Sequence, residues 1–211
     1  MHRIARILIR STPALIVAII MCQPTLAQMA TPAATPTVVT CSIEPRPIDF
    51  IGPLLETETP QTTPTPLAAL PGGTAADAET TAAVLAVVEE LTACVNAGDY
   101  LRAFALYDDA YLRRLIDPEG LMDPAVAIEI GKSLANVTPS NEDDITQITH
   151  IVAATVLPDG TVALAVETMG GVDREQDDTQ VDLFVLAQIS GSWRIVDSAA
   201  DIDFTLATPT S

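Results

Sequence analysis

The stretch from residue 179 to residue 197 has the most regular pattern in the chain. Apolar residues recur at every second position from Val181 to Ile189, and Asp182 is among the positions between them. Ser190-Gly191-Ser192 interrupts the pattern before it resumes at Trp193. A repeat of two residues with a glycine-centred break predicts a β-hairpin. The rest of the chain must either cover the sheet that contains this hairpin or tether it.

Two further strands are expected directly before the hairpin. Residues 145–157 are rich in β-branched side chains, residues 158–160 (Pro-Asp-Gly) form a turn signal, and residues 161–169 provide the second strand. A polar loop, residues 170–178, leads to the hairpin. Four antiparallel strands in sequence predict a meander.

Helical spacing of apolar residues characterises the chain before these strands. It predicts one amphipathic helix over about 79–97, a second over 100–116 with a break near Asp108, and a third over 124–135. Gly98 suits the left-handed position that ends a helix. Helices followed by strands predict an α+β fold rather than a parallel α/β sheet.

The first 27 residues have the features of a secretory signal. Basic residues precede a short apolar run over 14–22, and small residues end at Ala27. The run is shorter than the roughly 20 residues of a membrane-spanning helix. We therefore expect a secreted or extracytoplasmic protein with no membrane span after cleavage; an uncleaved anchor is the alternative.

Proline and threonine are concentrated in residues 28–40 and 57–73, which indicates linkers. Residues 41–56 between them carry enough apolar side chains to dock on a domain as an irregular arm with one helical turn. The expected organisation is a signal peptide (1–27), a spacer (28–76) with its docking arm around 41–56, a domain (77–204) and a disordered tail (205–211).

The chain carries 10 basic and 28 acidic residues, a formal net charge of −18. Removal of Arg3, Arg6 and Arg10 with the leader leaves 7 basic against 28 acidic residues, or −21. Such a body is repelled by phosphate backbones and anionic lipid surfaces. We expect no nucleic-acid partner, and solubility outside the cell is the simplest reason for the charge.

Two cysteines follow the leader, Cys41 and Cys94. An exported chain with an isolated pair more often forms a disulfide than a zinc site, which needs four ligands. Two buried thiols are the alternative. Asp173, Glu175 and Asp177 alternate in the polar loop, but the spacing lacks the glycine and the closing glutamate of a calcium-binding loop. We therefore expect no metal and no cofactor.

Three sequences together suggest a family: Asn96-Ala97-Gly98-Asp99 at a helical corner, residues 101–115, and the closing residues 190–197. Over about 77–204 the chain resembles the nuclear-transport-factor-2-like superfamily, in particular its SnoaL-like branch. The resemblance implies a cone in which a curved antiparallel sheet packs on three N-terminal helices and can enclose a pocket. Members include ketosteroid isomerase, scytalone dehydratase and many proteins with no catalysis, so the fold does not decide the function.

His150 is the only histidine after the leader, and the two-residue repeat of its strand predicts that it points to the apolar face. A general base needs such a place and a partner acid, for which Asp182, Glu167 and Asp108 are available. His150 and Asp182 are thus the candidate catalytic pair. The ordinary alternatives are a satisfied, partly buried histidine and an exposed strand end at Asp182.

Four aromatic residues are candidates for lining a pocket. Tyr100 and Tyr107 lie seven residues apart on one helical face, and Phe184 and Trp193 belong to the hairpin. Core packing is the ordinary alternative.

We expect a secreted or surface-tethered, non-enzymatic domain that binds an apolar small molecule or a protein. One alternative is a SnoaL-like lyase, isomerase or hydrolase that acts on a small hydrophobic substrate. A second is a scaffold that forms a homodimer through the open face of its sheet.

Overall fold

The alternating segments form an antiparallel sheet whose strands follow one another in space as they do in the sequence. The strands are β1 (Thr74–Ala75), β2 (Gln147–Val156), β3 (Val162–Met169), β4 (Thr179–Ile189) and β5 (Ser192–Ala199). The α+β class and the antiparallel meander are confirmed. The short β1, which pairs with the end of β2, makes the sheet five-stranded rather than four-stranded.

The structure is a computed structural model that describes residues 39–56, 70–171 and 178–202. The predicted signal peptide, most of both linkers, the acidic positions from Asp173 to Asp177 and the predicted tail lie outside these residues.

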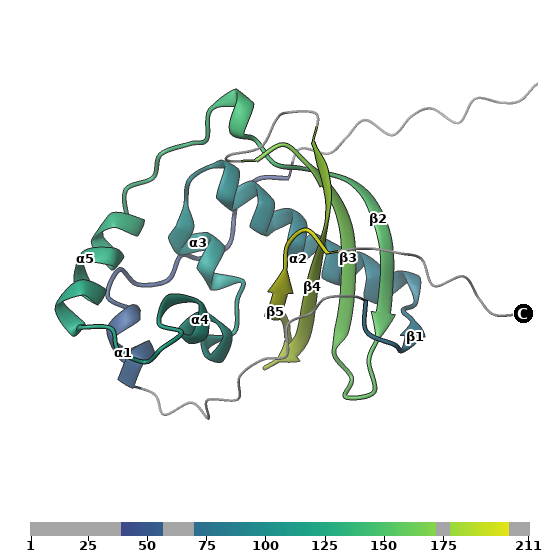
Figure 1. Cartoon of the computed structure of the whole chain (residues 1–211), viewed down its shortest axis with the longest axis horizontal. Coiled ribbons are helices and arrows are strands. Elements are labelled where there is room, and N and C mark those ends of the chain that lie inside the picture. Colours follow the sequence, from purple (N-terminus) through teal and green to yellow (C-terminus); the bar gives the residue numbers. More distant parts are fainter. Residues whose placement is uncertain (1–38, 57–69, 172–177, 203–211) are drawn as a thin grey trace, which may run out of the picture. The chain divides into compact units, whose positions relative to one another are not determined.

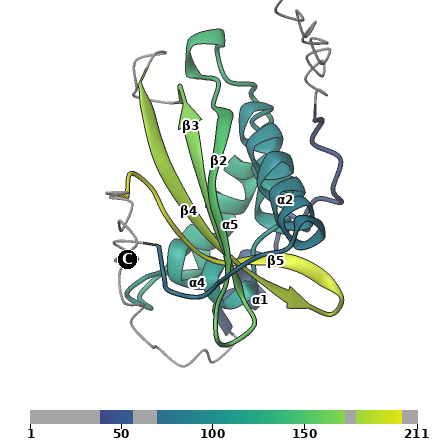
Figure 2. The ribbon, with the colours of Figure 1, turned by 90° about the vertical axis from the view of Figure 1, so that its right-hand side faces the viewer.

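Aspartates begin most of the helices. The helices are α1 (Ile51–Glu56), α2 (Ala78–Asn96), α3 (Tyr100–Ala105), α4 (Asp109–Ile116) and α5 (Pro124–Leu134), and a 3-10 turn η1 (Glu142–Asp144) precedes β2. Asp77, Asp99, Asp108 and Asp123 each accept a backbone N–H at the start of α2 to α5. The helices lie on one side of the sheet (Figures 1 and 2).

The sequence predicts three helices before the sheet, whereas the described chain has five. The docking arm contributes α1, and the second predicted helix is divided into α3 and α4. At the division, the backbone N–H of Asp108 donates to the carbonyl of Ile195 (2.9 Å), and that of Ile195 donates to the carbonyl of Leu106 (2.9 Å). These backbone groups pair with β5 instead of extending α3.

Both faces of the sheet are buried at its centre. We call the face that packs against α2 the inner face; Val162, Leu164, Val166, Leu186 and Ile195 contact Val84, Val88 and Leu91 there. The opposite, outer face has a smaller cluster of Ala163, Ala165, Leu183 and Ile202, with Leu70 packed against it. β3 therefore has buried residues on both faces, from Val162 to Val166.

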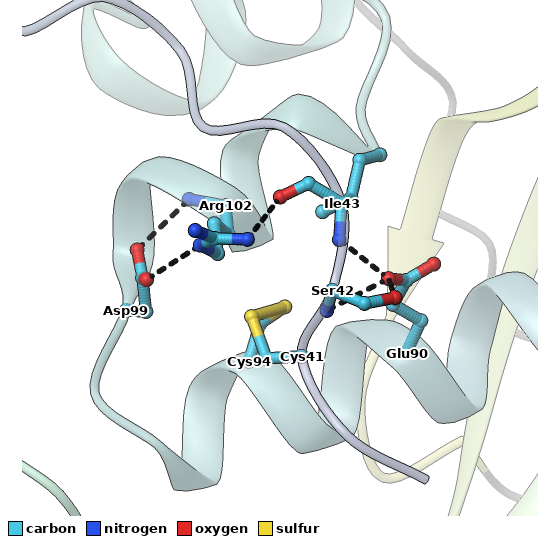
Figure 3. The surroundings of a disulfide bond; sticks show 7 residues. All are labelled: Cys41, Ser42, Ile43, Glu90, Cys94, Asp99 and Arg102. Carbon is cyan, nitrogen blue, oxygen red and sulfur yellow. Dashed lines mark hydrogen bonds and ion pairs between the residues drawn. A yellow bond between two sulfur atoms is a disulfide. The ribbon is translucent and has the colours of Figure 1, made fainter.

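The arm of residues 41–56 is attached to the helices by covalent and polar contacts. Cys41 and Cys94 form the predicted disulfide (Figure 3). Glu90 accepts the backbone N–H groups of Ser42 (3.1 Å) and Ile43 (2.7 Å), and Arg102 donates to the carbonyl of Ile43 (2.7 Å). These contacts fix the start of the arm on α2 and α3.

The end of the arm supplies part of a second hydrophobic cluster. Phe50, Ile51 and Leu54 are buried against Leu112 of α4 and Ala127 of α5. The arm thus covers apolar side chains of α4 and α5 that would otherwise face solvent at this point.

Candidate functional site

A cavity of about 170 Å³ lies between α2 and the inner face of the sheet. Its apolar wall comes from α2 and from β4: Val88, Leu91, Val95 and Phe184. Phe184 was predicted as a ligand-binding residue from its place in the hairpin, and it does line this cavity. A concave apolar site with a few polar groups is the usual form of a small-molecule site.

Asp182 provides the charged group of the cavity. It pairs with Val166 across the strands, so it points to the inner face, and it is half-buried. The hydroxyl of Thr168 donates to its Oδ2 (2.7 Å), and Nε2 of Gln180 donates to its Oδ1 (2.7 Å). The structure thus places Asp182 in a cavity and not at a fully exposed strand end.

Three threonines that line the cavity, Thr92, Thr146 and Thr168, were not predicted as site residues. Thr168 lies on the inner face of β3, and Thr146 precedes β2. Asn96 at the end of α2 holds Thr146 through both backbone groups, since its side chain donates to the Thr146 carbonyl (2.8 Å) and accepts its N–H (3.0 Å). For Thr168 a signal exists in the sequence: it shares its parity with Val162, Leu164 and Val166.

Tyr107 forms another part of the cavity wall. Its ring stacks on that of Tyr111 at 5.5 Å between centroids and meets the ring of Phe104 edge-on at 6.4 Å. Burial raises the pKa of the Tyr107 hydroxyl above its ordinary value, and the neighbouring Tyr111 raises it further. Tyr107 is therefore a neutral phenol at physiological pH, able to donate a hydrogen bond.

His150 does not lie on the apolar face of its strand, and this prediction is wrong. A β-bulge shifts the register of β2 between Ile148, which pairs with Thr168, and His150, which pairs with Glu167. Thr149 is the extra residue, so the parity of the strand changes and His150 falls on the outer face, exposed to solvent. It borders an open hollow of about 340 Å³ that is also lined by Leu85 and Glu89 of α2.

The predicted acid–base pair is consequently not assembled. Asp182 lies on the inner face of the sheet and His150 on the outer face. Of the other two acids considered, Glu167 is on the outer face and accepts the hydroxyl of Thr149 (3.0 Å), while Asp108 caps α4.

The remaining two predicted ligand-binding residues lie outside the cavity. Tyr100 is exposed on α3, with its ring 6.5 Å from that of Phe104. Trp193 is partly buried against the inner-face core and pairs with Gln188 near the hairpin turn. For Trp193 the ordinary alternative, core packing, describes its surroundings.

An open groove of about 380 Å³ lies next to the cavity, and Tyr107 borders both. The arm forms one side of the groove. Arg46 of the arm donates to the carbonyls of Phe104 (2.8 Å) and Tyr107 (2.9 Å) and forms an ion pair with Asp109 (2.7 Å). The arm therefore holds the backbone of the residue that separates groove from cavity.

No protein-family model matches this sequence, and no curated protein matches it. A comparison with solved structures finds a chain described as the crystal structure of the intermembrane space region of chloroplast protein ARC6. The two sequences are 17% identical, the match covers 61% of this chain and 98% of that chain, and the TM-score is 0.22. A similarity this low supports no inference about fold or function.

Two further features of the described residues bear on the kind of site. Within residues 39–56, 70–171 and 178–202 there is no cluster of three His, Cys, Asp or Glu side chains that could hold a metal ion. In the same ranges no helix has the length and apolar character needed to cross a membrane.

Proposed function

We propose that this protein is a non-enzymatic domain that binds a small apolar molecule in the cavity between α2 and the inner face. The observation that supports it most directly is the cavity itself, with an apolar wall and polar groups at Asp182, Thr168 and Tyr107. Its volume of about 170 Å³ is close to that of an apolar cavity of about 150 Å³ that accommodates benzene. The ligand is therefore small.

The proposed setting is extracytoplasmic. The disulfide between Cys41 and Cys94 fits an oxidising compartment, and the leader-like start and the Pro/Thr-rich linkers of the sequence agree with export. We also propose membership of the nuclear-transport-factor-2-like superfamily. The succession of helices and antiparallel strands, with a cavity between them, supports this assignment and its curved, cone-like sheet.

The alternative functions have less support. A SnoaL-like enzyme needs an acid–base pair at one site, and the candidate residues His150 and Asp182 lie on opposite faces of the sheet. A homodimer through the outer face would have to form over Leu70 and Ile202, which already pack on its centre.

The proposal is tested by benzene titration of the full chain, followed by ¹H–¹⁵N NMR. We expect chemical-shift changes at residues that line the cavity. Val95→Phe places a ring in the cavity and is expected to abolish these changes. Ala86→Phe introduces the same ring at an exposed position of α2 and is expected to leave them intact.

Native mass spectrometry of the protein isolated from its natural source provides an independent test, because a retained small molecule would appear as added mass. The proposal fails if benzene produces no saturable shifts around the cavity in the wild-type protein. It also fails if Val95→Phe binds benzene as the wild type does.

A further inference from the structure

We infer that the cavity selects a small organic cation, an aliphatic amine whose ammonium group binds the carboxylate of Asp182 and whose apolar body fills the remaining space. This inference rests on the proposed function and names the chemical class of its ligand. It is independent of any catalytic role for the residues involved.

The first support is the charge state of the surroundings of Asp182. Its hydrogen-bond donors are neutral: the Thr168 hydroxyl, the Gln180 amide and, at 3.4 Å, the backbone N–H of Asp201. The ion pairs within the described ranges involve other acids, namely Asp99, Asp109 and Glu129. No lysine or arginine lines the cavity within the part of the chain that the structure describes. The negative charge of a half-buried carboxylate is thus not offset there by a protein cation.

The second support is the balance of donors and acceptors in the cavity. A carboxylate can accept about four hydrogen bonds, so Asp182 retains acceptor capacity beyond its present donors. The hydroxyl of Thr92 donates to the Val88 carbonyl (2.9 Å), and that of Thr168 donates to Asp182. Each hydroxyl has only one proton, so neither of these two threonines has a proton left to donate to a ligand. Tyr107 and Thr146 also line the cavity, and the neutral phenol of Tyr107 can donate. The acceptor capacity of the Asp182 carboxylate therefore favours a ligand that donates hydrogen bonds over an anion.

The third support is the shape of the remaining space. Val88, Leu91, Val95 and Phe184 form an apolar wall around the polar end. An ammonium group with an aliphatic body of benzene size matches both the volume and this division into a polar and an apolar part. The acidic chain, with its formal net charge of −18, also attracts cations to its surface before they bind.

Two probes of the same shape test the inference: cyclopentylamine, which is protonated at pH 7, and cyclopentanol, which is neutral. Their dissociation constants for the full chain are measured by NMR titration. We expect the amine to bind about tenfold more tightly or better, as a charge-assisted hydrogen bond to a carboxylate allows. Asp182→Asn is expected to abolish this preference while cyclopentanol still binds.

Asp197→Asn is the matched control. Asp197 lies on the neighbouring β5 and pairs with Val185, so it points to the outer face. This variant removes the same charge from the protein and is expected to keep the amine preference. If it loses the preference as Asp182→Asn does, general charge attraction explains the result and the inference is overturned.

The outcomes separate the two proposals. Equal binding of amine and alcohol overturns the inference and leaves the binding function standing. Binding of neither probe contradicts the proposed function as well. If Asp182→Asn does not fold, the wild-type protein still decides, because NaCl screens the attraction of surface charges far more than a half-buried ion pair. The preference for the amine over the alcohol should persist at high salt, and its loss contradicts an ion pair with Asp182.

Discussion

Replacement of Cys41 by serine is expected to lower the free energy of unfolding by about 4 kcal/mol. The disulfide joins residues separated by 53 positions in the sequence. Closing a loop of this length removes conformational entropy from the unfolded chain, and the standard loop-entropy relation gives about 4 kcal/mol at 25 °C. Since small domains are stable by roughly 5–15 kcal/mol, the variant is expected to fold but to be markedly less stable.

The folded state itself should change little. Phe50, Ile51 and Leu54 remain available for the cluster with α4 and α5, and Arg46 keeps its contacts to α3 and α4. Cys94 has no exposed surface, so its free thiol is shielded from intermolecular exchange. The predicted loss therefore arises mainly in the unfolded state.

Urea unfolding followed by circular dichroism measures the free energy of unfolding and its dependence on urea concentration. The variant should show a lower free energy of unfolding and a larger dependence on urea concentration, because an unfolded chain without the crosslink exposes more surface. NMR spectra of the folded variant should retain the signals of α1. Ser42→Ala is the matched control: it removes the neighbouring hydroxyl bond to Glu90 (2.9 Å) at an exposed site, and a change within about 0.5 kcal/mol is expected.

The prediction is refuted if the free energy of unfolding falls by less than about 1 kcal/mol and its dependence on urea concentration does not change. Residual structure in the unfolded chain would then already restrict it as much as the disulfide does. Loss of the α1 signals in the folded variant would refute it in another way. It would show that the disulfide, and not the buried apolar side chains, holds the arm in place.

Two further predictions concern backbone geometry and alkaline stability. Gly98→Ala should cost more than about 3 kcal/mol in urea unfolding, because φ is +67° and a Cβ would lie 1.9 Å from the Thr138 carbonyl oxygen; Gly160→Ala, also at positive φ but in open space, should cost about 1–2 kcal/mol. Equal losses would contradict the steric argument. Burial raises the pKa of Tyr107 above 10.0, so its contribution to stability is complete below about pH 10 and is lost as the unfolded chain deprotonates at higher pH. In the Tyr107→Phe variant, the free energy of unfolding should decline less between about pH 9.5 and 11 than in the wild type. The control is Tyr100→Phe, at an exposed tyrosine. An equal change in the control would show that burial of Tyr107 is not the cause.

Much of the fold follows from periodicities that can be counted along one segment. The two-residue repeats predicted β3, β4 and β5 close to their observed bounds, and helical spacing located α2. The disulfide was predicted from chemistry: Cys41 and Cys94 are the two cysteines after the predicted leader, and such a pair in an exported chain more often forms a disulfide than a zinc site. The strands and α2 follow from which side chains are buried, and the spacing of apolar residues in the sequence shows this directly.

The candidate site was predictable only in part. Asp182 and Phe184 are two residues apart on β4, which pairs with β3 without a register shift. A count of alternate residues along the strand therefore correctly predicts that both point to the same face as each other. The same count fails at His150, because one extra residue at Thr149 inverts the parity of β2. A bulge depends on pairing with another strand, and no pattern within β2 marks it.

The sequence by itself therefore determined the class of the fold and the succession of β2 to β5, since both depend on local periodicity. The chemistry of two cysteines favoured the covalent attachment of the arm. Only the tertiary structure decided which polar side chains share a cavity. The division between α3 and α4 follows from hydrogen bonds to β5, and the cavity follows from the way α2 lies over the inner face. Both depend on contacts between segments that are far apart in the chain, where periodicity carries no information.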